Sequence, residues 1–329
     1  PTTPTSGETS RTSSSTWSGD GKAKMALSRR ARFIRWLTSR YIRRVDIPNA
    51  PVAKMRERLD LLGRMGRSAR HVAIDVGSLA GRHAEWYRPQ GAAAGKVLLY
   101  LHGGAYALGS CDSHRKMVTH IARAAQVDAV MPEYRLAPEH PFPAGLDDAI
   151  AGYRELLDKG YGPDDIVIGG DSAGGGLTVA ALLQMRHLGL PLPGAVVLLS
   201  PFLDMTASGE SMKTRAEREP WFHPDEVEVV IRYYCPDEDL HNPLLSPVFA
   251  NVAGLPPTLI QVGDDEILLS DSTRFAHKLE TAGIDVELDV FPEMWHVFQL
   301  FVGKMPESKA AIEKVGAYLR ARLELPEST

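Results

Sequence analysis

The sequence contains only two cysteines, Cys111 and Cys235, among its 329 residues. They allow one disulfide at most, and their spacing does not suggest a metal site. No apolar run reaches the roughly 18 residues that can cross a membrane. The N-terminal segment also lacks the basic-then-apolar order of a secretory signal peptide. We therefore expect no bound metal, no integral membrane segment and a reducing, cytoplasmic location.

The chain also lacks an excess of cations, since its formal net charge is −4. This balance gives no reason to expect a nucleic-acid partner. The glycine run 174–176 is followed by no Walker lysine, and no G-x-G-x-x-G motif opens it. A nucleotide site is therefore not expected there.

Apolar segments with strand and helix character alternate from residue 97 onward. Strands are predicted at 97–101, 128–131, 166–168, 196–199, 259–262 and 286–291, with helices at 146–157 and 177–185. Such alternation predicts an α/β fold, in which a mostly parallel sheet is covered by helices on both faces.

Gly170-Asp171-Ser172-Ala173-Gly174 is the most informative motif, because it lies between a predicted strand and a predicted helix. This arrangement is typical of a nucleophile elbow, in which small residues on both sides of the serine let strand and helix approach closely. Ser172 is the candidate nucleophile. The amide of Ala173, at the start of the helix, is a candidate donor to an oxyanion. The motif also occurs by chance in glycine-rich loops, but the flanking elements favour the catalytic interpretation.

A second motif, His102-Gly103-Gly104-Ala105, directly follows the predicted strand 97–101. The backbone amides of Gly103 and Gly104 are predicted to complete an oxyanion hole with Ala173. A plain Gly-Gly turn is the alternative. The position of the motif upstream of the elbow favours the first interpretation.

The general base should be a histidine that follows Ser172 and a carboxylate in the chain. His277 lies in a segment with the apolar spacing of a surface helix. His296 instead lies in the loop after the last predicted strand, from which an imidazole can reach back over the elbow. His296 is therefore the candidate base.

Three adjacent carboxylates, Asp264, Asp265 and Glu266, follow the preceding strand. Spacing alone does not choose among them, because capping of the next helix or exposure to solvent accounts equally well for any two. Asp204, after the strand at 196–199, is a weaker candidate for the catalytic acid.

With the run 134–144 between them, the His102 and Ser172 motifs resemble those of the bacterial hormone-sensitive-lipase family of carboxylesterases. The resemblance extends from about residue 50 to about residue 325 and implies an α/β-hydrolase fold with a helical cap. It aligns Glu266-Ile267-Leu268 with the family's Asp-Pro-Leu, which implies Glu266 as the acid. Ala105 departs from the usual His-Gly-Gly-Gly. The resemblance also implies that Arg135 and Glu139 support the oxyanion loop, although surface charge explains them equally well.

The chain divides into three predicted regions. Residues 1–21 are almost all Ser, Thr, Pro and Gly, a composition that predicts a disordered tail. Residues 22–50 are expected to form N-terminal cap helices. Residues 51–329 are expected to form the catalytic domain, with a cap insertion at about 202–250.

Residues 28–44 combine seven arginines with apolar residues at helical spacing. A basic amphipathic helix of this kind can lie on an anionic membrane. The helix can equally pack its apolar stripe over an active site as part of a cap. Because the predicted site needs a lid, we favour the cap over membrane binding.

The predicted mechanism is an acyl transfer in which His296, oriented by Glu266, removes the proton of Ser172 as it attacks an ester. It requires neither a metal nor an organic cofactor. The resemblance implies small acyl esters of short to medium chain as substrates. Predicted pocket walls are the aromatic residues Trp36, Tyr106, Trp221 and Phe222, which ordinary packing between cap and body would explain equally well.

Two alternatives remain open. An amidase, a deacetylase or a lipase could use the same triad. A non-catalytic receptor on the same fold is disfavoured because His296 is present. We also predict a homodimer that pairs the last strand, 286–291, across a two-fold axis, although Glu287 and Asp289 could keep that edge solitary.

Overall fold

The computed structural model describes residues 27–41 and 50–326. Its centre is one eight-stranded sheet with the order β1-β2-β4-β3-β5-β6-β7-β8. The strands are β1 (Val72–Leu79), β2 (Arg82–Pro89), β3 (Val97–Leu101), β4 (Asp128–Pro132), β5 (Ile166–Asp171), β6 (Ala195–Leu199), β7 (Thr258–Gly263) and β8 (Val286–Phe291). All pairs from β4 to β8 are parallel, which confirms the predicted mostly parallel sheet.

The first two strands are the part of the sheet that was not predicted. β1 and β2 form an antiparallel pair, and β2 joins β4 in antiparallel orientation. Most of β1 is exposed, so it lacks the continuous apolar run that identifies the buried central strands.

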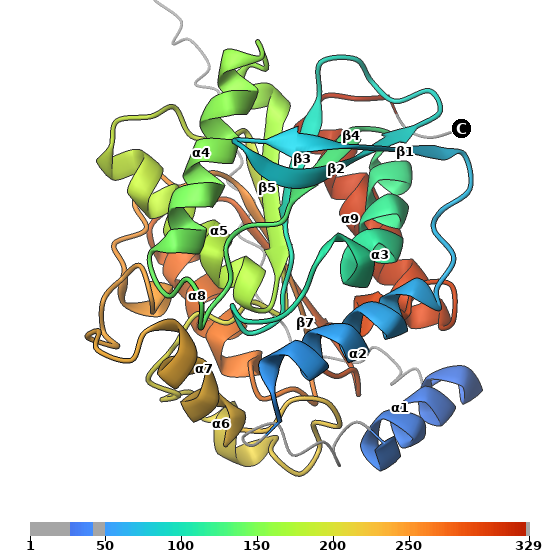
Figure 1. The fold of residues 1–329 in the computed structure, drawn as a ribbon, viewed down its shortest axis with the longest axis vertical. Coiled ribbons are helices and arrows are strands. Elements are labelled where there is room, and N and C mark those ends of the chain that lie inside the picture. The colour runs from blue at the N-terminus through green and yellow to red at the C-terminus, as the bar shows by residue number, and fades with distance from the viewer. Residues whose placement is uncertain (1–26, 42–49, 327–329) are drawn as a thin grey trace, which may run out of the picture.

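Helices cover both faces of the sheet. They are α3 (Cys111–Ala125), α4 (Ala144–Asp158), α5 (Ala173–His187), α8 (Leu269–Thr281) and α9 (Pro306–Arg322). Figure 1 shows α4 and α5 on one side of the central strands and α3 and α9 on the other. Each side has its own hydrophobic core, the first including Leu146, Leu177 and Phe275 and the second including Met117 and Ile312.

The parallel strands bring several loops to one edge of the sheet. The register pairs Leu101 with Gly170, and Asp171 with Leu199, so β3, β5 and β6 end side by side. β7 and β8 end together at Gly263 and Phe291. In open α/β sheets this carboxyl edge is where sites are built, and the loops that carry Ser172, Glu266 and His296 all leave from it.

The remaining helices lie beyond this edge, in the lower part of Figure 1. They are α1 (Arg29–Tyr41), α2 (Val52–Arg64), α6 (Ser211–Thr214) and α7 (Glu226–Tyr234). Helices α6 and α7 fall within the predicted insertion at about 202–250. Helix α1 falls within the predicted region 22–50, whereas α2 falls in the segment assigned to the catalytic domain. The predicted tail, residues 1–21, lies outside the described residues.

α1 buries one face and exposes the other. Ala31, Ile34 and Thr38 are buried, and the helix packs against a cluster that includes Met294, Trp295 and Phe298. The helix therefore packs onto the body of the protein through this face. Phe33, Trp36 and Leu37 remain exposed.

None of the described helices combines the length and the apolar content required of a membrane-spanning segment.

Candidate active site

Ser172 lies in the sharp turn between β5 and α5, with φ 51° and ψ −121°. This left-handed backbone is costly for a residue with a side chain and is a frequent feature of functional turns. A Cβ at Gly170 or Gly174 would collide with the carbonyl oxygen of Leu101 at the end of β3. The two glycines thus let the turn lie directly against the neighbouring strand.

His296 and Glu266 meet at this serine. The Nε2 atom of His296 lies 2.9 Å from the Oγ of Ser172, and its Nδ1 atom lies 2.9 Å from Oε2 of Glu266. Glu266 is fully buried, and His296 is 5% exposed. The structure therefore brings the three predicted side chains into one hydrogen-bonded line.

The second carboxylate oxygen of Glu266 is also occupied. Oε1 accepts a hydrogen bond of 2.9 Å from the Ser200 hydroxyl and another from the backbone amide of Gly263. The Ser200 hydroxyl in turn accepts from the amide of Val297, next to His296. These contacts fix the carboxylate in the orientation that faces the imidazole.

The other carboxylates have different partners. Asp265 is buried between the guanidinium groups of Arg35 and Arg218, each 2.7 Å away. Asp264 lies 3.4 Å from Arg215. Asp204 binds Arg274 and two nearby hydroxyl groups, and does not contact the imidazole.

Glu266 determines the electrostatics of the imidazole. Burial acts to lower the pKa of His296, but the hydrogen bond and the charge of Glu266 outweigh it, so the pKa is raised above its ordinary 6.5. A carboxylate in this position is suited to stabilise an imidazolium.

Glu219, which sequence reasoning missed, fixes the loop that carries the imidazole. Its Oε2 accepts from the backbone amide of His296 at 3.0 Å, and its Oε1 accepts from the amide of Trp221 at 2.8 Å. It is almost fully buried, and burial raises its pKa to about 8. A single acidic residue in a charged stretch carries no signal of such a role.

The loop after β3 is tied to the elbow by Asp171. This buried carboxylate accepts from the Tyr100 hydroxyl at 2.8 Å and from the amide of Gly103 at 3.1 Å, and it lies 3.2 Å from Nε2 of His114. Burial acts to raise its pKa, but His114 and Tyr100 outweigh that effect and lower it. The predicted oxyanion role of Gly103 therefore needs correction, because its amide already has an acceptor.

Gly104, Ala105 and Ala173 differ from Gly103 in this respect. Their backbone amides have no hydrogen-bond partner among the described residues. Gly104 and Ala105 have positive φ angles of 123° and 55°, and Ala173 is the first residue of α5. Free amides at a helix start and in a turn are suited to bind a negative oxygen.

His102 lies outside the hydrogen-bonded line of Ser172, His296 and Glu266. It is fully buried, stacks on Tyr134, and has its pKa lowered to about 4, mainly by burial.

A cavity of about 580 Å³ opens onto Ser172 and His296. It is lined by α2 and α7 and by two of the four predicted aromatic residues, Trp221 and Phe222. The other two predictions are wrong. Trp36 points to solvent and stacks on Phe33, and Tyr106 is buried against Tyr234.

Arg35 of α1 connects the N-terminal helix to the loops of the site. Its guanidinium donates to Asp265, to the carbonyl of Glu293 and to the carbonyl of Arg218. Arg56 of α2 makes a similar link, since it binds Glu139 and the carbonyl of Ala107 in the loop after β3. Arg135 instead pairs with Asp148.

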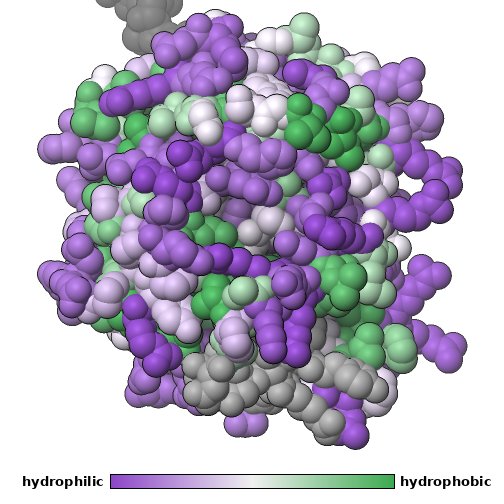
Figure 2. All heavy atoms as spheres, viewed as in Figure 1, coloured by the Kyte–Doolittle hydropathy of each residue, from purple (hydrophilic) through white to green (hydrophobic). Residues whose placement is uncertain are grey.

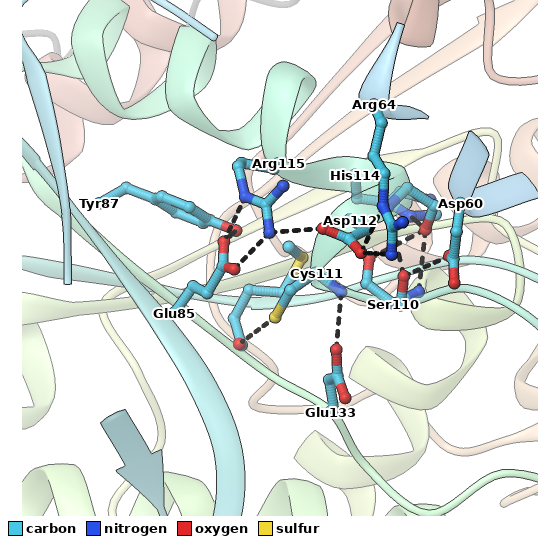
Figure 3. Close-up of polar contacts among 12 residues, drawn as sticks. Asp60, Arg64, Glu85, Tyr87, Ser110, Cys111, Asp112, His114, Arg115 and Glu133 are labelled. Atoms are coloured by element: carbon cyan, nitrogen blue, oxygen red, sulfur yellow. Dashed lines mark hydrogen bonds and ion pairs between the residues drawn. The ribbon is translucent and has the colours of Figure 1, made fainter. Parts of the chain in front are cut away.

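One group of potential metal ligands occurs among the described residues. Ligand atoms of His83, Cys111 and Glu133 lie within 4.8 Å of one another. Figure 3 shows that Cys111 already has partners, because its thiol donates to the carbonyl of Met131 and its amide to Glu133. Burial raises the pKa of this thiol, which keeps it protonated and a poor ligand.

Comparison with known proteins gives the same architecture. Residues 98–300 match the family described as the alpha/beta hydrolase fold. The chain is 42% identical over 246 residues to an acetyl-hydrolase of Streptomyces hygroscopicus, covering 75% of this chain and 82% of the relative. It is 36% identical over 272 residues to an esterase of Acinetobacter venetianus, covering 82% and 88%.

Among solved structures, the fold is similar to that of an esterase from the bacterial hormone-sensitive lipase family. The TM-score is 0.86 at 40% identity, over 91% of this chain and all of the other.

Proposed function

We propose that this chain, which belongs to the α/β-hydrolase family, works through an acyl-enzyme on Ser172. It is a carboxylic ester hydrolase of the bacterial hormone-sensitive-lipase branch of that family. The observation that carries the proposal is the hydrogen-bonded line from Ser172 through His296 to Glu266. Our assignment makes Ser172 the nucleophile, His296 the general base and Glu266 the acid that orients it.

The first half of the reaction forms the acyl-enzyme. The Oγ of Ser172 attacks the ester carbonyl while its proton passes to Nε2 of His296. The C–O bond to the alcohol then breaks, and the imidazolium gives its proton to the departing oxygen. In the second half, water takes the place of the serine as nucleophile, and the carboxylic acid is released.

The negative oxygen of each tetrahedral intermediate needs donors that are free before the reaction. We assign this role to the amides of Gly104 and Ala173, with Ala105 as a third donor in place of Gly103. Gly103 then has a positioning role, because its bond to Asp171 holds the loop against the elbow. No step of this scheme requires a metal or an organic cofactor.

The size of the cavity supports small acyl esters of short to medium chain. A volume of about 580 Å³ falls in the range of small-molecule sites, and apolar side chains such as Leu59, Phe222 and Val229 contribute to its walls. The Streptomyces relative carries the name acetyl-hydrolase, which favours the short end of this range. An amide, an acetylated sugar or a long-chain lipid would meet the same triad, so these substrates remain the alternatives.

We also propose a cytoplasmic location. Cys111 and Cys235 are both free thiols and buried, as expected in a reducing compartment.

A chain-length series tests the proposed substrate class. We expect p-nitrophenyl acetate and butyrate to have a higher kcat/KM than the octanoate, and the palmitate to be the poorest. The matching anilides and a panel of acetylated sugars test the alternatives, with Ser172→Ala as the control for uncatalysed hydrolysis. A higher kcat/KM for an anilide or for the palmitate than for the butyrate would contradict the proposal.

A further inference from the structure

Helices α1 and α2 expose an unusual number of large apolar side chains. Phe33, Trp36 and Leu37 on α1 and Leu61, Leu62 and Met65 at the end of α2 are between 41% and 70% exposed. Figure 2 shows hydrophobic atoms at the lower right, where Figure 1 places these two helices. Grouped exposure of this kind marks an interaction surface, whereas isolated apolar residues are common on any protein.

A groove of about 810 Å³ runs between the two helices. Phe33, Leu37, Leu62 and Met65 line it, and it shares Leu59, Leu62, Trp221 and Leu300 with the wall of the catalytic cavity. The groove is thus a neighbour of the active site that the proposed reaction does not use.

The rim of the groove is positively charged. Its described lining residues include Arg29, Arg30, Lys116 and Lys304 and no carboxylate. Lys116 and Lys304 line the same groove, and burial together with the charge of Lys304 lowers the pKa of Lys116 to about 8. α1 contains five arginines and no acidic residue, in a chain whose net charge is −4.

We propose that the face formed by α1, the end of α2 and the groove between them docks this enzyme onto an anionic lipid surface. Exposed aromatic and aliphatic side chains insert at the boundary between headgroups and acyl chains, and Trp36 suits that boundary because indole is amphipathic. The surrounding arginines and lysines bind the phosphate headgroups. A second copy of the chain fits less well, because its identical face would oppose cation to cation.

Binding to vesicles tests the proposal without relying on catalysis. Vesicles of phosphatidylcholine and phosphatidylglycerol in equal amounts are compared with vesicles of phosphatidylcholine alone in a flotation assay. We expect the full chain to float with the anionic vesicles only, and binding to weaken in high salt. Ser172→Ala should bind equally, so a failure of the proposed reaction is separable from a failure of docking.

Two variants and two matched controls locate the surface. Arg29→Gln/Arg32→Gln should lower partitioning more than tenfold, since each arginine near an anionic surface contributes about fivefold. Trp36→Ser should weaken binding yet keep the hydrolysis of a soluble ester, because Trp36 lines neither cavity. Arg154→Gln on α4 and Leu188→Ser after α5 change similarly exposed residues away from this face and should bind as wild type.

Fluorescence gives an independent measurement. The emission of Trp36, taken as the difference between wild type and Trp36→Phe, should shift to the blue on anionic vesicles. Three results would overturn the proposal: no binding, equal binding to neutral vesicles, or equal loss in the control variants. A dimer in solution that Trp36→Ser dissociates would also overturn it, because the face would then be an interface between two copies.

Discussion

Replacing Glu266 by glutamine tests the proposed site most sharply, because the change keeps the shape of the side chain and removes its charge. In the wild type, both carboxylate oxygens of Glu266 accept hydrogen bonds from its neighbours. A glutamine has only one acceptor oxygen. If that oxygen faces His296, the amide nitrogen must face the N–H group of Gly263, and the reverse orientation places two donors against each other at the imidazole.

The magnitude follows from these contacts. The lost attraction between the carboxylate and the imidazolium is worth about 4 kcal/mol for a charge pair in a protein. A buried donor left without an acceptor costs about 1–3 kcal/mol. Part of this second cost lowers the free energy of unfolding and does not affect the reaction. We therefore expect the activation free energy of the acyl transfer to rise by about 5 kcal/mol, and kcat to fall by about ten-thousand-fold.

The pH profile adds a second readout. The reaction needs a neutral His296, so kcat/KM rises as pH increases through the pKa of that imidazole. Glu266 holds the pKa above 6.5 against burial, which acts to lower it. In Glu266→Gln the acidic limb should therefore move to lower pH, while the plateau falls.

Asp265→Asn is the matched control. Asp265 is adjacent in sequence and buried, but it binds Arg35 and Arg218 and touches neither His296 nor Ser172. Both arginines are partly exposed, so the loss of their ion pairs with Asp265 should reduce kcat by less than about tenfold. Steady-state kinetics on p-nitrophenyl butyrate compares the two variants. If Asp265→Asn were the inactive variant and Glu266→Gln kept its activity, the assignment of the acid would be refuted.

Three further predictions concern the nucleophile, the histidine loop and the sheet edge. Ser172→Ala should lose about a million-fold in kcat, while its circular dichroism spectrum stays unchanged. A fluorophosphonate should react with Ser172 in the wild type, and mass spectrometry should find the adduct on that residue. More than a few per cent of residual activity in Ser172→Ala would argue against the assignment. Glu219→Ala should lower kcat/KM at least tenfold, because the buried amide of His296 loses its acceptor at about 1–3 kcal/mol and the partly buried amide of Trp221 loses its acceptor as well. Glu219→Gln should lose less because it keeps one acceptor oxygen, and wild-type kinetics in both variants would exclude a positioning role. Light scattering should give the mass of a dimer paired through β8, and a monomer at micromolar concentration would rule the dimer out.

The parallel half of the fold was predictable because its strands are buried on both faces. β3 and β6 are continuous apolar runs, as are the first three residues of β5, and all members of these three strands are buried. β1 and β2 gave a weaker signal. β1 is exposed along most of its length and contains Asp75 and Gly77, so it has no run of buried apolar residues that would identify it.

The site was predictable where backbone geometry dictates residue type. The elbow requires glycines around Ser172, and the loop after β3 requires a glycine where φ is 123°, at Gly104. The error at Gly103 has a physical origin. Sequence shows which amides a glycine leaves accessible, but the orientation of the Gly103 amide toward Asp171 depends on a contact between residues 68 positions apart.

The helices over the site show the limit of sequence reasoning most clearly. A helix with a wide apolar surface has to bury part of it, but the sequence does not state which part or against what. In α1, Ala31, Ile34 and Thr38 are buried, whereas Phe33, Trp36 and Leu37 of the same turns face outward. Arg35 makes three hydrogen bonds to segments 183 to 258 residues away, and Ser28 before the helix bonds Glu307. Because these long-range contacts hold α1 against the loops of Glu266 and His296, they also help to determine which apolar side chains remain exposed.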